Sequence, residues 1–202
     1  MTCGISIQTS RATLTQLGAI VGATVHSRRH DAMTNHTTKL QSAVREQLDA
    51  LARLWFDGWK DAHADIVPAE LVRLRTLESF RARLDVWPAS IRVALWANVP
   101  VGFSMSKGDE LNQFYVSPVA RGTEVAPALM SDAVERLSAS GAKTAWLACA
   151  IGNTRAARFY EKTGWRRTGT MSNRLSTQEG VFTLEVWRYE IQLSPLKFDT
   201  FA

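Results

Sequence analysis

Apolar residues recur three and four positions apart through residues 46–59 of the 202-residue chain. This spacing places them on one face of a helix. The face consists of Leu48, Leu51, Ala52, Trp55, Phe56 and Trp59. Pro68 suits the first turn of a helix, so we expect shorter helices over 69–74 and 77–84, after a loop over 61–67.

Seven short runs rich in β-branched and aromatic residues predict strands. They cover residues 39–44, 91–97, 101–105, 111–116, 145–150, 165–171 and 181–191. A turn at Asn98-Val99-Pro100 is expected to join the second run to the third, and a polar loop over 172–180 the last two. The run 145–150 is continuously apolar, which is typical of an inner strand.

Between these strands, two helices carry clear start and stop signals. A loop over 121–126 opens a helix with an apolar residue at every fourth position, and Gly141 ends it. Asn153 is expected to cap a second helix, which Gly164 ends. A strand, loop and helix start in this order form a natural anion site, because the first N–H groups of the helix have no partner.

Composition narrows the function classes. With 46% hydrophobic and 21% charged residues the chain can bury a full core, and the net charge of +5 suits a polyanionic ligand. No basic run with interleaved aromatic residues predicts nucleic-acid binding, and the four histidines are too scattered to predict a metal site. Two distant cysteines and no apolar run of ~20 residues favour a reduced cytoplasmic protein without membrane binding. Cys149, in the inner strand, is expected to be a small buried hydrophobe.

Two motifs carry a resemblance to a known family. They are Arg121-x-x-Glu124-x-Ala126 after a strand, and Asn153-x-x-Ala156-x-x-Phe159-Tyr160-Glu161-Lys162-x-Gly164-Trp165 downstream. Together they resemble the GNAT superfamily of acetyl-CoA-dependent N-acetyltransferases, over roughly residues 40–193. The resemblance implies an α/β fold with a mixed, mostly antiparallel seven-stranded sheet, flanking helices and a splayed central strand pair.

The same resemblance implies the reaction. An acetyl group would pass from acetyl-CoA to a primary amine by direct attack in a ternary complex. The acceptor is either a small-molecule amine or a protein amino group, and by analogy with the family a homodimer is expected. The domain itself would span 35–194, with a disordered or mis-started extension over 1–34 and a tail over 195–202. Asp31 is the only acidic residue before Met33, the alternative start.

The resemblance also supplies catalytic candidates. An amine is mostly protonated at neutral pH, so the transfer needs a base. Glu110 begins the strand where several family members carry a general-base glutamate, and Asp57 and Glu185 are weaker candidates. Tyr160 matches the tyrosine that acts as general acid at the coenzyme sulfur, although an ordinary core aromatic would give the same pattern.

Coenzyme contacts follow from the motifs as well. The backbone of Phe114, Tyr115 and Val116 would hold the pantetheine arm, and Asn153 and Ala156 would add contacts from the next helix. The loop that would cradle the pyrophosphate consists of Arg121, Gly122, Thr123, Glu124, Val125 and Ala126. Glu124 departs from the family's usual glycine, so its side chain either points to solvent or weakens coenzyme binding.

The acceptor pocket is expected between the first helices and the loop 172–180. Trp55, Trp59 and His63 are the substrate-binding candidates, with core packing as the alternative for the two tryptophans. Aromatic residues near the entrance would suit a ring-bearing or cationic amine. Two other functions stay open: a non-catalytic acyl-CoA-binding or regulatory module on the same fold, which Glu124 makes conceivable, and a basic adaptor that binds partners.

Overall fold

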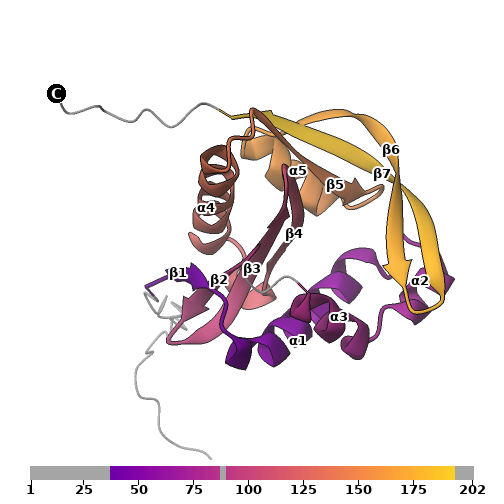
Figure 1. The fold of residues 1–202 in the computed structure, drawn as a ribbon, viewed down its shortest axis with the longest axis horizontal. Helices are drawn as coiled ribbons and strands as arrows, with labels where there is room; N and C mark the ends of the chain where they lie inside the picture. Colours follow the sequence, from indigo (N-terminus) through magenta and orange to yellow (C-terminus); the bar gives the residue numbers. More distant parts are fainter. Residues whose placement is uncertain (1–36, 87–89, 194–202) are drawn as a thin grey trace, which may run out of the picture. The chain divides into compact units, whose positions relative to one another are not determined.

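Seven strands form one sheet in the part of the chain that the computed structural model describes, residues 37–86 and 90–193. The strand order is β1-β2-β3-β4-β5-β7-β6, and only β4 and β5 are parallel neighbours (Figure 1). The strands are β1 (Lys39–Ser42), β2 (Ile91–Trp96), β3 (Val99–Lys107), β4 (Glu110–Val116), β5 (Thr144–Ala150), β6 (Arg166–Thr177) and β7 (Gly180–Gln192). The mixed, mostly antiparallel α/β fold is therefore confirmed. The extension expected over 1–34 and the tail over 195–202 lie outside the described residues, as do residues 35, 36 and 194 of the expected domain.

Five α-helices flank this sheet within the described residues. They are α1 (Leu48–His63), α2 (Ala69–Leu74), α3 (Leu77–Asp85), α4 (Val125–Ala139) and α5 (Thr154–Lys162), with short 3-10 helices η1 (Arg45–Gln47) and η3 (Pro118–Ala120). The apolar face of α1 is buried as predicted, apart from Phe56, which is half-buried. However, α1 continues to His63, so the loop expected over 61–67 is shorter than predicted. Thr76 caps α3, because its Oγ1 accepts a hydrogen bond from the Ser79 N–H at 3.2 Å.

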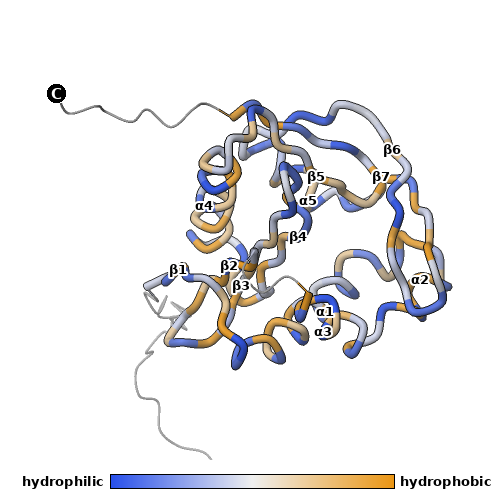
Figure 2. Tube along the Cα trace, in the orientation of Figure 1, coloured by the Kyte–Doolittle hydropathy of each residue, from blue (hydrophilic) through white to orange (hydrophobic). Residues whose placement is uncertain are grey.

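The helices cover opposite faces of the sheet. Ile91, Val93 and Leu95 alternate along β2 and pack against α1 and α3. Ala94 points to the other face and packs with Val125 of α4. Figure 1 shows α1 and α3 on one side of β2–β4 and α4 on the other, and Figure 2 shows the hydrophobic residues gathered along β2 and β3 between them.

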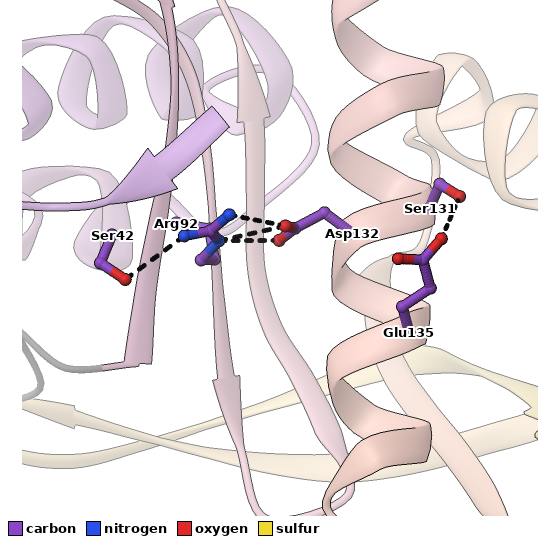
Figure 3. A network of polar contacts seen from close by, with 5 residues as sticks. All are labelled: Ser42, Arg92, Ser131, Asp132 and Glu135. Atoms are coloured by element: carbon purple, nitrogen blue, oxygen red, sulfur yellow. Dashed lines mark hydrogen bonds and ion pairs between the residues drawn. The ribbon is translucent and has the colours of Figure 1, made fainter. Parts of the chain in front are cut away.

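A charged pair links the sheet to α4. Arg92 of β2 donates to both carboxylate oxygens of Asp132, at distances of 2.7 to 3.2 Å, and also to the Ser42 hydroxyl of β1 (Figure 3). The Arg92 and Asp132 side chains are only 16% and 17% exposed. A bidentate pair shielded from water in this way is stronger than a surface ion pair.

We expect Asp132→Ala to lower the free energy of unfolding by about 1–3 kcal/mol, because it leaves the Arg92 guanidinium largely buried without its anion. Urea unfolding measures this loss. Glu135→Ala is the matched control on the same helix, since Glu135 is exposed and accepts a hydrogen bond from the Ser131 hydroxyl at 3.2 Å. If both variants lose the same free energy of unfolding, the Arg92–Asp132 pair contributes no more to stability than an exposed contact does.

Two turns differ from their predicted positions. The first hairpin turns at Ala97 and Asn98, which both have positive φ, and β3 already begins at Val99. The polar loop predicted over 172–180 is wrong, because β6 continues to Thr177 and pairs with β7 up to Gly180. This part of β6 lies at the edge of the sheet, and every second residue in it is half-buried while the others are exposed. Such a strand needs few apolar residues to form.

Candidate active site

The parallel neighbours β4 and β5 part soon after they meet. Only Glu110 and Trp146 pair between the two strands, and the Trp146 N–H donates to the Asp109 carbonyl at 3.1 Å. On its other side β4 pairs with β3 along its whole length. From Leu111 to Val116, the β4 backbone groups that face β5 therefore have no strand partner among the described residues. The splayed central pair that the family resemblance implied is present.

Two cavities meet at this gap. The first, of about 230 Å³, lies beside α5 and is called here the α5-side cavity. The second, of about 480 Å³, lies against the β6–β7 hairpin and is called the hairpin-side cavity. Both are lined by His63, Asn112, Gln113, Tyr115, Ala148 and Ala150. A molecule in one cavity can therefore reach a molecule in the other through the gap.

Helix α5 brings Tyr160 to the α5-side cavity. Asn153 Oδ1 caps this helix by accepting the Ala156 N–H at 3.2 Å, as predicted, and Gly164 ends it with a φ of +92°. Tyr160 is only 9% exposed, and no described residue forms a hydrogen bond with its hydroxyl. Burial raises the pKa of Tyr160 far above its ordinary value, so the phenol keeps its proton at neutral pH.

The strand residues expected to hold the pantetheine arm also line this cavity: Phe114, Tyr115 and Val116. Asn153 and Ala156 join them there. Cys149 lines the cavity too, but burial raises the pKa of its thiol to about 12, so it is no nucleophile at neutral pH.

The loop before α4 presents free backbone donors. The N–H groups of Gly122, Thr123 and Glu124 have no acceptor among the described residues, and Gly122 adopts a φ of +76°. The Thr123 hydroxyl fixes the loop by donating to the Ala120 carbonyl at 2.7 Å and accepting from the Val125 N–H at 3.3 Å. Such a run of N–H groups at a helix start binds anions. The Glu124 side chain is exposed.

Of the six loop residues, only Arg121 lines the α5-side cavity itself, while Val125 is fully buried in the core. Arg155 of α5 lines the same cavity. Asp61 Oδ2 accepts from Arg121 at 2.7 Å and from Arg155 at 2.6 Å, and these two bonds, Arg155 first, lower the pKa of Asp61. Neither Asp61 nor Arg155 was predicted as a site residue from the sequence, because neither belongs to a motif that assigns it a role.

Glu110 and His63 are the titratable groups near the gap. Glu110 is half-buried in the hairpin-side cavity, where burial raises its pKa and a hydrogen bond from Asn112 Nδ2 at 2.9 Å opposes this rise. His63 Nδ1 donates to the Trp59 carbonyl at 3.0 Å, so Nε2 is left as the proton acceptor. Burial lowers the pKa of His63, which keeps the ring neutral at pH 7.

Of the remaining site candidates from the sequence, one lines a cavity and the others lie outside both cavities. Trp59 stacks on His63 with ring centroids 5.2 Å apart and lines the hairpin-side cavity. Trp55 is fully buried and lines neither cavity. Asp57 is exposed away from both cavities, and Glu185 also lies outside them, where the Ser172 hydroxyl donates to it.

Gly58 makes room for Tyr115. A Cβ at Gly58 would lie 2.9 Å from Cδ1 of the Tyr115 ring, closer than real side chains approach. Any larger residue would therefore push the ring that borders both cavities.

Two structural features that often define other kinds of site are missing from the described residues. They hold no group of three His, Cys, Asp or Glu residues placed to bind a metal, and none of their helices is long and apolar enough to cross a membrane.

Comparisons with known proteins bear on this geometry. An uncharacterized N-acetyltransferase of Mycobacterium tuberculosis is 40% identical over 80 residues, which cover 37% of this chain and 51% of that protein. The chain thus spans about half the length of the curated relatives it matches.

Solved structures show the same fold. A GCN5-related N-acetyltransferase of Rhodopseudomonas palustris superposes with a TM-score of 0.62 at 23% identity, covering 78% of this chain and 96% of that one. The PaiA N-acetyltransferase of Thermoplasma acidophilum, solved in complex with coenzyme A, gives a TM-score of 0.57 at 17% identity and covers 77% and 99%. The family model described as the acetyltransferase (GNAT) family matches residues 48–165, more than half of the sequence. By this match the chain belongs to the GNAT acetyltransferase family.

Proposed function

We propose that this protein transfers the acetyl group of acetyl-CoA to a primary amine by direct attack in a ternary complex. The observation that carries the proposal is the gap between β4 and β5, where two cavities meet. A transfer between two bound molecules needs such an arrangement, because the amine and the thioester must touch while each is held from its own side.

The α5-side cavity and the adjoining loop suit acetyl-CoA. The free N–H groups of residues 122–124 offer donors for a pyrophosphate, and Arg121 and Arg155 add positive charge. The unpaired edge of β4 offers backbone groups to the amide-bearing pantetheine arm, as an added strand would. When bound there, acetyl-CoA supplies an activated acetyl thioester. The Thermoplasma acidophilum relative, solved with coenzyme A, supports this assignment.

The residues at the gap divide the proton chemistry. As a base, Glu110 takes the proton that the amine loses on attack, directly or through water, and its raised pKa improves it for that role. A β4 N–H donates to the carbonyl oxygen and polarises it. Tyr160 donates to the thiolate that leaves when the carbon–sulfur bond breaks. His63, which is neutral and lines both cavities, is the alternative base.

The proposal is tested by free-thiol release from acetyl-CoA with a panel of amines, alongside calorimetry of acetyl-CoA binding to the same protein. We expect saturable binding and amine-dependent thiol release. Binding without release for any amine would favour a non-catalytic acyl-CoA-binding module. The absence of both would support the partner-binding adaptor instead.

Glu124→Gly should tighten acetyl-CoA binding about two- to fivefold, because it removes an exposed carboxylate from the loop that faces phosphate. Calorimetry at low salt measures the change. Glu124→Gln is the matched variant, since it removes the charge but keeps the side chain. If Glu124→Gln binds acetyl-CoA as tightly as Glu124→Gly, the negative charge of Glu124 weakens binding. If only Glu124→Gly binds more tightly, the size of the side chain is the cause. Weaker binding in the Gly variant would contradict the assigned loop.

A further inference from the structure

Positive charge dominates the wall of the hairpin-side cavity. Among the described residues, four cationic side chains line it, from Arg75, Arg83, Lys107 and Arg174, against a single carboxylate, that of Glu110. The walls also include the apolar side chains of Val67, Leu71, Val86, Leu175 and Leu184. The rings of Trp59, Tyr115 and Trp146 line the cavity too and would suit a cationic amine. The excess of cationic side chains over carboxylates, however, would repel an amine that carries no anionic group.

Arg75 is a buried cation without an acidic partner. It is 4% exposed, and its Nη1 donates to the Ser176 carbonyl at 3.1 Å. No described carboxylate lies within ion-pair distance of it. Arg73, two residues earlier on α2, is exposed and forms two bonds of 2.8 Å to Glu179. The buried arginine thus lacks the counterion that its exposed neighbour has.

Arg83 on α3 is half-buried and also lacks a counterion in the described part of the chain. Its guanidinium carbon lies 4.4 Å from the centroid of the Trp55 ring, which holds the group in place, and it too has no acidic partner among the described residues. Burial and the nearby charge of Arg75 lower the pKa of Arg83 to about 10. Arg81, two residues earlier, pairs with Asp49 at 2.5 Å and with Asp85 at 2.6 Å.

A buried cation and a half-buried one beside it, both without an anion, are costly for a folded protein. An anion bound between them offsets that cost, and planar guanidinium groups suit carboxylate and phosphate oxygens. In the same cavity Glu110 offers the opposite charge to an ammonium group. The cavity therefore presents charges that complement a molecule carrying both an amine and an acid.

We propose that the acceptor is a small primary amine that also carries a carboxylate or phosphate group, which Arg75 and Arg83 bind while the amine lies toward Glu110. This inference rests on the proposed acetyl transfer. The apolar walls favour a molecule with an apolar body, such as an aromatic or aliphatic amino acid. The volume of about 480 Å³ is ample for one. Trp55, a substrate candidate from the sequence, acts here as the support beneath Arg83.

Matched acceptors test the proposal. Thiol release is measured at saturating acetyl-CoA for free amino acids, their carboxamides and their decarboxylated amines, with phosphoethanolamine against ethanolamine as the phosphate arm. We expect kcat/KM for the acid to exceed that for its amide by about tenfold or more, because a charge-assisted pair is lost in the amide. Amides or simple amines that react as well as the acids would overturn the inference while leaving acetyl transfer intact.

Binding provides a readout that does not depend on turnover. Calorimetry of phenylalanine and phenylalaninamide on the CoA-saturated protein is expected to detect only the acid. If no amine releases thiol, the proposed acetyl transfer fails, yet selective binding of the acid would still support the anion site. Equal binding of the two, or binding of neither, would overturn it.

Arg83→Gln is the diagnostic variant, with Arg81→Gln on the same helix as its control. Arg83→Gln should raise KM for the acid about tenfold or more and leave the amide unchanged, because only the acid loses a partner. Arg81→Gln should keep the preference for the acid. Arg83→Lys keeps a positive charge and should therefore keep part of the preference for the acid over the amide. Equal losses for acid and amide in Arg83→Gln would indicate a merely structural role.

Discussion

Tyr160→Phe is expected to lower kcat about 100-fold, the loss typical of removing a positioned general acid. The hydroxyl lies at the α5-side cavity without a partner among the described residues, and its raised pKa keeps it protonated and able to donate to the leaving thiolate. The phenyl ring keeps its packing against Phe159 and Tyr189. Acetyl-CoA affinity should therefore stay unchanged.

Tyr189→Phe provides the control for this prediction. It also deletes one phenol hydroxyl from the same aromatic cluster, but that hydroxyl donates to Glu161 at 3.2 Å and lines neither cavity. Steady-state kinetics with calorimetry of acetyl-CoA separates turnover from binding. If Tyr160→Phe keeps the kcat of the unsubstituted protein, another donor must protonate the thiolate.

Glu110→Gln is expected to lower kcat/KM about 100-fold by removing the base, while the glutamine still accepts the Asn112 bond. It should also make the folded protein more stable at neutral pH. Burial raises the pKa of Glu110, so the folded state favours the protonated form. The stabilisation is fully present below the ordinary carboxyl pKa and is lost as pH rises through the raised one. A glutamine at this position is neutral at every pH, so the variant does not lose this stability as pH rises.

Thermal unfolding across pH 4 to 8 checks the stability half of this prediction, and pH–rate profiles check the catalytic half. Glu135→Gln, an exposed carboxylate on α4, is the control for both. An unchanged kcat/KM in Glu110→Gln would contradict its role and point to His63 Nε2 as the base. If the unfolding temperatures of Glu110→Gln and of the unsubstituted protein change identically with pH, the raised pKa of Glu110 is contradicted.

Local signals made the elements around the gap predictable. Asn153 and Gly164 bound α5 because a side-chain cap and a positive φ are short-range features. The continuous apolar run gave β5 within one residue of its observed start. The strand over 165–171 was predicted, but the continuation of β6 over 172–177 was missed because an edge strand lacks the apolar alternation that marks a strand with one buried face.

The electrostatics of the two cavities could not be predicted from local sequence. Asp61 meets Arg155 across 94 positions, and Arg75 meets Ser176 across 101. The sequence near Arg81 does offer a partner, Asp85 four residues on, but Asp49, the other partner of Arg81, and Glu179, the partner of Arg73, are distant in the sequence. In the fold Arg73 meets Glu179 at the β6–β7 turn, whereas Arg75 and Arg83 line the hairpin-side cavity.

The most direct test of the central claim, that acetyl-CoA binds at the parted strands, is a backbone amide NMR titration of the protein with acetyl-CoA. We predict saturable shifts concentrated on β4 residues 111–116 and on the loop N–H groups of residues 122–124. Shifts confined to other regions, or no shifts at saturating acetyl-CoA, would contradict this account.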